Sequence, residues 1–161
     1  MPKQRCIETD IKNSRLSEDS QKAHIAFYRF LNDNGFSIVP PDDVNGWHIT
    51  YSNVFVGWVN YDHKETGNDV GIWLDKHDFS CDSASNALKE ITWAHVRSCE
   101  HFHSNGEKCG CGQQPGYSGN LFGREFENLC FARLEFMDSD AETLEYIKEL
   151  MLLVKQQKSP L

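Results

Sequence analysis

The pattern of apolar and polar positions predicts a first helix over residues 17–34. Apolar residues recur there three and four positions apart, which places them on one face of an α-helix. Serine side chains can cap its start, and Asn34-Gly35 stops it, because glycine accepts the left-handed conformation of a helix C-terminal cap. The apolar positions on the expected buried face are Ala23, Phe27, Phe30 and Leu31.

Alternating apolar and polar residues follow, which is typical of strands with one buried face. Three strands are predicted, over residues 47–51, 54–61 and 70–74. Ser52-Asn53 suits a tight turn between the first two strands, and the polar segment 62–69 suits a hairpin loop before the third. We expect these strands to form an antiparallel meander with one face packed under the first helix.

The pattern is less regular after the third strand. A short helix is predicted over residues 84–90. The next segment, residues 91–96, fits either a continuation of that helix or a strand, and its β-branched and aromatic content favours a strand. A further strand is predicted over residues 129–136, where apolar residues alternate again.

A last helix is predicted from residue 141 to about residue 155. Ser139 and Glu142 have the spacing of a capping box, in which two side chains satisfy backbone N–H groups at the helix start. The apolar residues of this helix again recur at helical spacing and predict a buried stripe. They are Leu144, Ile147, Met151 and Val154.

Together these elements predict an α+β fold, in which an antiparallel sheet of about five strands has helices packed on one face and carries a Cys-rich, metal-bound loop. Residues 1–16 are polar and aperiodic, so we expect a flexible N-terminal arm. Residues 17–161 are expected to form a single α+β domain, because a chain of 161 residues can bury one core without further support. The Cys-rich loop spans residues 99–130.

Charge and composition exclude several classes of protein. The chain has a formal net charge of -8, whereas a general nucleic-acid binder needs clustered lysine and arginine. Its longest apolar run, residues 150–154, is far shorter than a membrane-spanning helix. The chain does not open with a basic segment followed by an apolar one, so no secretory signal is expected. We therefore predict a cytoplasmic protein whose partner is a protein or a small molecule, not nucleic acid or a membrane.

Residues 99–130 have the composition that most demands a chemical explanation. Four of the six cysteines and two of the seven histidines lie in this segment. In a reducing compartment, clustered cysteines point to metal binding rather than to disulfides. Zinc takes four soft ligands in a tetrahedral arrangement, and thiolates favour zinc over magnesium or calcium. The expected thiolate ligands are Cys99, Cys109, Cys111 and Cys130.

The ligand set has alternatives. His101 and His103 lie close enough to Cys99 along the chain for chelation of the same ion. A histidine can therefore replace Cys109 or Cys111, and His103 is included among the predicted zinc ligands. Two other states remain open, namely unliganded thiols and a disulfide, either within the Cys-Gly-Cys pair or between the first and last cysteines of the segment.

The C-terminal part of the chain contains a motif of aromatic and charged residues that ends at a cysteine. It reads Phe-Gly-Arg-Glu-Phe-Glu-Asn-Leu-Cys over residues 122–130, and an acidic helix follows from Glu142. Together with Cys99, Cys111 and Pro115-Gly116, this stretch resembles a bacterial family of small cysteine-cluster proteins that has no assigned function. The resemblance implies a cysteine site and no particular activity. The chain departs from the family pattern in the middle of the cluster, which leaves two ligands open.

We expect a non-catalytic binding or regulatory protein stabilised by a structural zinc site, which is closed when four protein ligands surround the ion. The chain has no P-loop, dinucleotide-binding, nucleophile-elbow or His-Glu-x-x-His motif, so no catalytic residue is predicted. One alternative is a metal- or thiol-dependent enzyme acting on a small molecule, with water at the fourth zinc position. Another is an acidic inhibitor or immunity-type protein that binds a basic partner.

Overall fold

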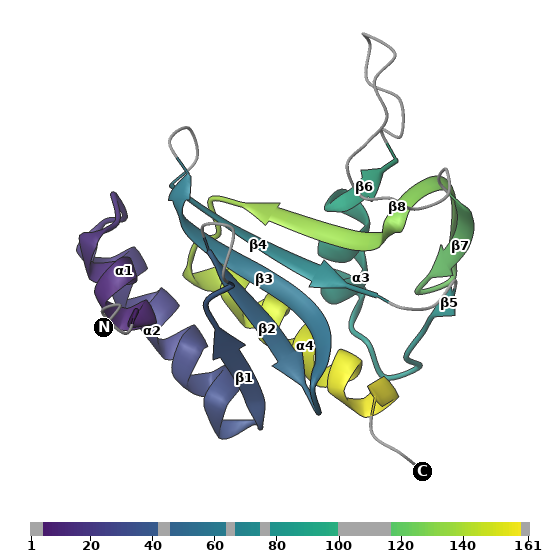
Figure 1. The fold of residues 1–161 in the computed structure, drawn as a ribbon. Helices are drawn as coiled ribbons and strands as arrows, with labels where there is room; N and C mark the ends of the chain where they lie inside the picture. Colours follow the sequence, from purple (N-terminus) through teal and green to yellow (C-terminus); the bar gives the residue numbers. More distant parts are fainter. Residues whose placement is uncertain (1–4, 42–45, 64–66, 75–77, 100–116, 159–161) are drawn as a thin grey trace, which may run out of the picture. The chain divides into compact units, whose positions relative to one another are not determined.

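The computed structural model describes residues 5–41, 46–63, 67–74, 78–99 and 117–158, which form an α+β fold (Figure 1). These residues contain eight strands, not the five or so that were predicted. None of the described helices is long and apolar enough to cross a membrane. The helices are α1 (Ile7–Asn13), α2 (Glu18–Asp33), α3 (Asn86–Ala94) and α4 (Ala141–Lys158). The strands are β1 (Phe36–Val39), β2 (Trp47–Tyr51), β3 (Val54–His63), β4 (Gly67–Trp73), β5 (Asp78–Phe79), β6 (Val96–Ser98), β7 (Tyr117–Leu121) and β8 (Arg124–Met137).

The chain divides into two compact units, and the single domain over residues 17–161 stays a prediction. Unit 1 comprises Met1–Ile72 and Phe136–Leu161, and unit 2 comprises Trp73–Glu135. Unit 1 is therefore built from two separate segments of the chain, and β8 contributes residues to both units. The strand pairs within each unit are antiparallel, except that β5 pairs with β7 in parallel.

Strands β1 to β4 form the predicted antiparallel meander, with one strand added at its start. Ser52 and Asn53 have φ angles of 50° and 63°, as a two-residue hairpin turn with the twist of the strands requires. The sheet begins at Phe36, ahead of the first strand that was predicted, over residues 47–51. Strand β1 lies at the edge of the described sheet, next to β2, and ends at Val39. Pro40 and Pro41, which have no backbone N–H, therefore remove no hydrogen bond between β1 and β2.

The two long helices of unit 1 form as predicted and lie on one face of its sheet (Figure 1). The Ser17 hydroxyl accepts a hydrogen bond from the Ser20 N–H at 3.2 Å, which caps the start of α2. Gly35 follows the helix with a φ of +83°, where a side chain would be strained. Burying the apolar stripes of both helices against the strands supplies most of the stabilisation of such a core. The buried side chains include Phe27, Leu31, Ile49, Val56, Leu144, Ile147, Met151 and Val154.

The segment predicted as a flexible arm, residues 1–16, contains α1. Ile7 and Ile11 are 3% and 0% exposed, and they face the core because residues four apart share a helix face. The Trp47 indole N–H donates to Asp10 at 3.0 Å, which ties α1 to the first residue of β2. Two isoleucines one turn apart are too few to establish a helical period in the sequence, so the arm interpretation does not hold for α1.

Helix α3 is longer than predicted, and residues 91–94 belong to it rather than to a strand. The Ser85 hydroxyl accepts from the Leu88 N–H at 3.1 Å and caps its start. Thr92 is fully buried, and its hydroxyl donates to the Leu88 carbonyl at 2.7 Å, so the β-branched residue satisfies its polar group within the helix. Of the segment 91–96 that was expected to form a strand, only Val96 does so, as the first residue of β6.

Strands β7 and β8 of unit 2 form a hairpin that closes at Phe122 and Gly123, whose φ angles are 50° and 86°. The Phe122 N–H donates to the Phe79 carbonyl at 2.8 Å, and the two rings meet nearly edge to face with centroids 5.3 Å apart. The Trp93 indole N–H donates to the Leu121 carbonyl at 2.7 Å, which fastens α3 to the same hairpin. In this turn Phe122 is buried and Gly123 is exposed, whereas both turn residues of unit 1, Ser52 and Asn53, are exposed.

Candidate functional site

Two of the predicted zinc ligands lie on or next to the paired strands β6 and β8 of unit 2. Cys99 follows β6 and is half-buried, whereas Cys130 lies within β8 and is 8% exposed. Cys99 is a free thiol, as are Cys6 and Cys81. The other predicted ligands, Cys109, Cys111 and His103, lie outside the residues that the structure describes. The alternative ligand His101 lies outside them as well.

Strands β6 and β8 pair in antiparallel fashion, as the metal-site prediction requires, with Ser98 opposite Leu129. The pairing continues one residue further, because the Cys99 N–H donates to the Asn128 carbonyl at 2.7 Å. The Asn128 side-chain amide donates back to the Cys99 carbonyl at 3.1 Å. Cys99 is thus fixed opposite a residue two positions from Cys130 along β8.

The local backbone of β8 is irregular next to Cys130. Asn128 has a φ of 57°, and the β7–β8 register shifts by one residue beside it, which is the signature of a β-bulge. The register between β6 and β8 also shifts, between Val96 and Ser98. Within the part of the chain that the structure describes, no three His, Cys, Asp or Glu side chains gather to hold a metal. A zinc site here would need ligands from residues 100–116.

A second cluster of polar side chains lies inside unit 1. His24 of α2 is fully buried, and its Nδ1 lies 3.2 Å from the hydroxyl of Tyr61 in β3. Its Nε2 lies 3.1 Å from the carbonyl oxygen of Ser139, in the turn before α4. The His24 and Tyr61 rings meet edge to face with centroids 5.2 Å apart. The four residues His24, Tyr61, Ser139 and Asn68, the last from β4, are named the His24 clamp.

Asn68 holds the turn before α4 from the sheet. Its side-chain oxygen accepts from the Ser139 N–H at 3.2 Å, and its carbonyl accepts from the Asp138 N–H at 2.9 Å. Ser139, predicted to cap α4, is instead 3% exposed and belongs to the clamp. Asp140 caps the helix, because its carboxylate accepts from the Thr143 N–H at 2.8 Å. The next residue in the chain thus takes over the capping role.

Burial sets the protonation state of the clamp. It lowers the pKa of His24, while the hydrogen bond to Ser139 and the charge of Asp138 raise it to a smaller extent. Burial also raises the pKa of Tyr61 well above its usual value. Both side chains are therefore neutral at neutral pH. Among the described residues, the Asn68 side-chain nitrogen and the Ser139 hydroxyl have no hydrogen-bond partner.

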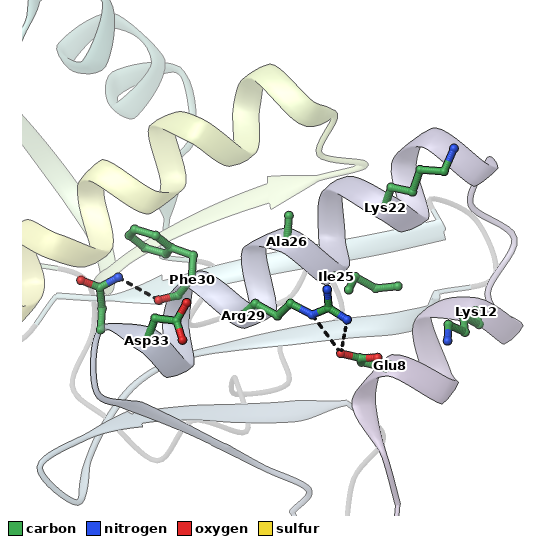
Figure 2. A pocket seen from close by; sticks show the side chains of 9 residues that line it. Glu8, Lys12, Lys22, Ile25, Ala26, Arg29, Phe30 and Asp33 are labelled. Carbon is green, nitrogen blue, oxygen red and sulfur yellow. Dashed lines mark hydrogen bonds and ion pairs between the residues drawn. The ribbon is translucent and has the colours of Figure 1, made fainter.

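A groove of about 600 Å³ lies between α1 and the exposed face of α2 (Figure 2). Arg29 extends from α2 towards α1, and its Nε and Nη2 donate to Glu8 at 3.3 and 3.2 Å. Lys12 and Lys22 add positive charge, and Asp33 adds negative charge at the C-terminal end of α2. The groove can hold a ligand by charge and apolar contact, but its described lining has no cysteine, serine or histidine to act as nucleophile or base. The lining residues are Glu8, Lys12, Lys22, Ile25, Ala26, Arg29, Phe30, Asp33 and Asn34.

The sequence patterns did not single out the His24 clamp. The available signal was that His24 shares a helix face with Phe27 and Leu31, three and seven residues later. A histidine on an apolar face must find polar partners inside the core, which Tyr61 and Ser139 supply. No family model, no curated protein and no solved structure matches the chain. The resemblance to a bacterial cysteine-cluster family therefore stays a prediction.

Proposed function

We propose that the chain is a non-catalytic binding or regulatory protein whose unit 2 is stabilised by a structural zinc ion. The proposed ligands come from Cys99, Cys109, Cys111 and Cys130, with His103 as the replacement for one of the two central cysteines. The observation that supports this most is the hydrogen-bonded pairing of Cys99 with Asn128, two residues from Cys130. It anchors the first ligand beside the strand that carries the last.

The chemistry of the site favours a structural ion over a catalytic one. Four thiolates, or three with one imidazole, saturate a tetrahedral zinc and leave no position for water. Because Cys130 lies in a strand and is 8% exposed, a metal bound to it would connect residues 100–116 to the core of unit 2. The free energy of metal binding then becomes partly free energy of folding.

The described residues also favour binding over catalysis. His24 is fully buried, and its two ring nitrogens are occupied by Tyr61 and Ser139, so it cannot reach a substrate. The groove beside α2 is lined by charged side chains, among them the Arg29–Glu8 pair, together with the apolar side chains of Ile25, Ala26 and Phe30. These features suit recognition of a ligand without chemical conversion.

Metal analysis of cysteine variants tests the proposal. We expect about one zinc per chain in the wild type and loss of that zinc in Cys99→Ser and Cys130→Ser. The matched control is Cys81→Ser, since Cys81 is another free thiol of unit 2 outside the proposed site. Amide exchange should rise in β6 and β8 of the two ligand variants and stay unchanged in the control. Purified wild-type protein without stoichiometric metal, or Cys130→Ser protein that keeps it, would refute the zinc site.

A further inference from the structure

The hydrogen bonds of the His24 clamp fix which ring nitrogen carries the proton. The Ser139 carbonyl can only accept, so Nε2 of His24 must be the donor at this 3.1 Å contact. In the neutral ring Nδ1 is then an acceptor, and the Tyr61 hydroxyl donates to it at 3.2 Å. Every polar atom of the imidazole is satisfied in this neutral form and in this tautomer.

The clamp also fixes the start of α4. The Ser139 carbonyl is held by His24 of α2, and the Ser139 N–H is held by Asn68 of β4. The next residue, Asp140, supplies the cap and accepts the Leu144 N–H with its carbonyl at 3.0 Å. The position of the first turn of α4 therefore depends on the peptide group that His24 holds.

We propose that the His24 clamp is a proton-sensitive latch, in which protonation of His24 releases the turn at residues 138–140 and loosens the first turn of α4. Protonation places a hydrogen on Nδ1, so the Tyr61 oxygen must accept and its own O–H must turn to another partner inside the core. The imidazolium is also a charge on a side chain with no exposed surface. An unpaired buried charge is far more stable in water, which favours opening.

The charged groups around the clamp do not remove this penalty. From the turn, Asp138 attracts a protonated ring, but it is exposed and solvent screens its charge. From α4, the exposed Asp140 carboxylate is occupied by the Thr143 N–H. From β4, Asp69 follows Asn68 and projects from the opposite face of the strand, because successive strand residues alternate. From β3, Tyr61 stays neutral, since burial raises its pKa.

The closed latch is held by few interactions, which makes it sensitive to one proton. The Asn68 side-chain nitrogen and the Ser139 hydroxyl lack hydrogen-bond partners among the described residues, and each such group reduces the net stability of the closed form. The pKa of His24 is lowered by folding, so the unfolded state binds more protons at acidic pH. Stability from the clamp is thus complete above a pH of about 6.5 and decreases as the pH falls below it.

The test compares wild type with His24→Gln. The glutamine amide can donate to the Ser139 carbonyl and accept from the Tyr61 hydroxyl, but it does not titrate. Amide exchange, corrected for intrinsic rates, is measured between pH 7.5 and 5 at Ser139, Thr143 and Leu144. In the wild type, protection of these amides should fall by up to about tenfold per pH unit below about 6.5, whereas His24→Gln should show no such fall. The Ile49 amide in β2 serves as the reference within unit 1.

Two results would overturn the latch. One is an equal loss of protection with acid in wild type and His24→Gln. The other is observed in wild type alone, by nitrogen chemical shifts of labelled His24, which keeps the test decisive if the variant does not fold. A ring that titrates at the ordinary pKa of about 6.5 while the Thr143 and Leu144 amides keep their protection would show that its charge does not open the turn.

Discussion

Among the described residues, the two longest helices of unit 1 have 16 and 18 residues, whereas the helix of unit 2 has 9 residues and its two shortest strands have 2 and 3 residues. The long helices of unit 1 bury continuous apolar stripes over four strands, and its main polar intrusion is the His24 clamp. Register shifts occur in the strand pairings of both units, at Ile49/Thr50 and Asn60/His63 in unit 1 and at Val96/Ser98 and Tyr117/Gly119 in unit 2. The two units therefore differ in the length of their helices rather than in the regularity of their strand pairing.

The two tight hairpin turns also differ between the units. In unit 1 the left-handed positions are Ser52 and Asn53, two exposed polar residues that tolerate this conformation. In unit 2 they are Phe122 and Gly123, and Phe122 is only 6% exposed. A phenylalanine with positive φ is uncommon, so packing of its ring must outweigh the backbone strain. Unit 2 therefore obtains stability from single side chains at irregular positions.

Replacement of two matched phenylalanines by alanine should have the largest effect on stability. Phe27 of α2 and Phe79 of β5 are both 1% exposed, one in each unit. Each loss of a buried ring should lower the free energy of unfolding by about 3–5 kcal/mol. Denaturant titration followed through backbone amide signals of both units measures the loss.

The same pair tests whether the units unfold separately. Phe27→Ala should reduce amide protection mainly in β2 and β3, and Phe79→Ala mainly in α3 and β7. Asp19→Ala is the control, because the Asp19 side chain is 95% exposed and its pairing with Lys22 contributes little. If both phenylalanine variants lost protection equally everywhere, the units would be one cooperative structure.

An intermediate effect is expected from Ile11→Ala in α1. Ile11 has no exposed surface, so its truncation should lower the free energy of unfolding by about 2–3 kcal/mol. The exposed neighbour Thr9 provides the matched control, since Thr9→Ala removes side-chain atoms from the same helix without opening the core. Both variants are compared by thermal unfolding. A melting temperature unchanged by Ile11→Ala would restore the flexible-arm interpretation of the first 16 residues.

The smallest effect is expected from the cap of α4. Asp140→Ala should cost about 1 kcal/mol, because the Thr143 N–H loses its acceptor, while Glu142→Ala should cost less. The hydrogen bond from Thr143 lowers the pKa of Asp140, so the cap is effective above a pH of about 4 and is lost as the pH falls. The free energies of unfolding of Asp140→Ala and wild type should therefore differ at pH 7 and approach each other at pH 3, which unfolding titrations at the two pH values measure. Equal losses in the two variants would favour the Ser139–Glu142 capping box.

Elements with a long apolar period could be predicted from the sequence. Helices α2 and α4 and the turn at Ser52-Asn53 lie where the pattern placed them. Helix α1 was missed because two isoleucines do not establish a period, and β1 was missed because its four residues are too few to establish an alternation. Residues 91–94 were assigned to a strand because β-branched residues usually favour strands, but the buried Thr92 hydroxyl finds its acceptor inside a helix.

The zinc site inferred from the clustering of cysteines stays a prediction, because most of its ligands lie outside the described residues. The antiparallel pairing of β6 with β8 was expected, and it brings Cys99 beside the strand that contains Cys130. The His24 clamp depends on three segments that are far apart in the sequence, and no local pattern reports which of them meet. Ser139 was assigned to the helix cap by spacing alone, and the neighbouring Asp140 fills that position while Ser139 is buried.

The discontinuity of unit 1 has a consequence for the order in which the chain is synthesised. The chain leaves unit 1 at Ile72 and returns at Phe136, so α4 emerges from the ribosome only after all of unit 2. Translation of the 63 residues from Trp73 to Glu135 takes roughly 3–13 seconds at common elongation rates. During that interval the face of α2 that contacts α4 has no partner within unit 1. The unit with the longer helices is therefore the one whose core closes last, and until then its apolar surface is accessible to chaperones and to other chains.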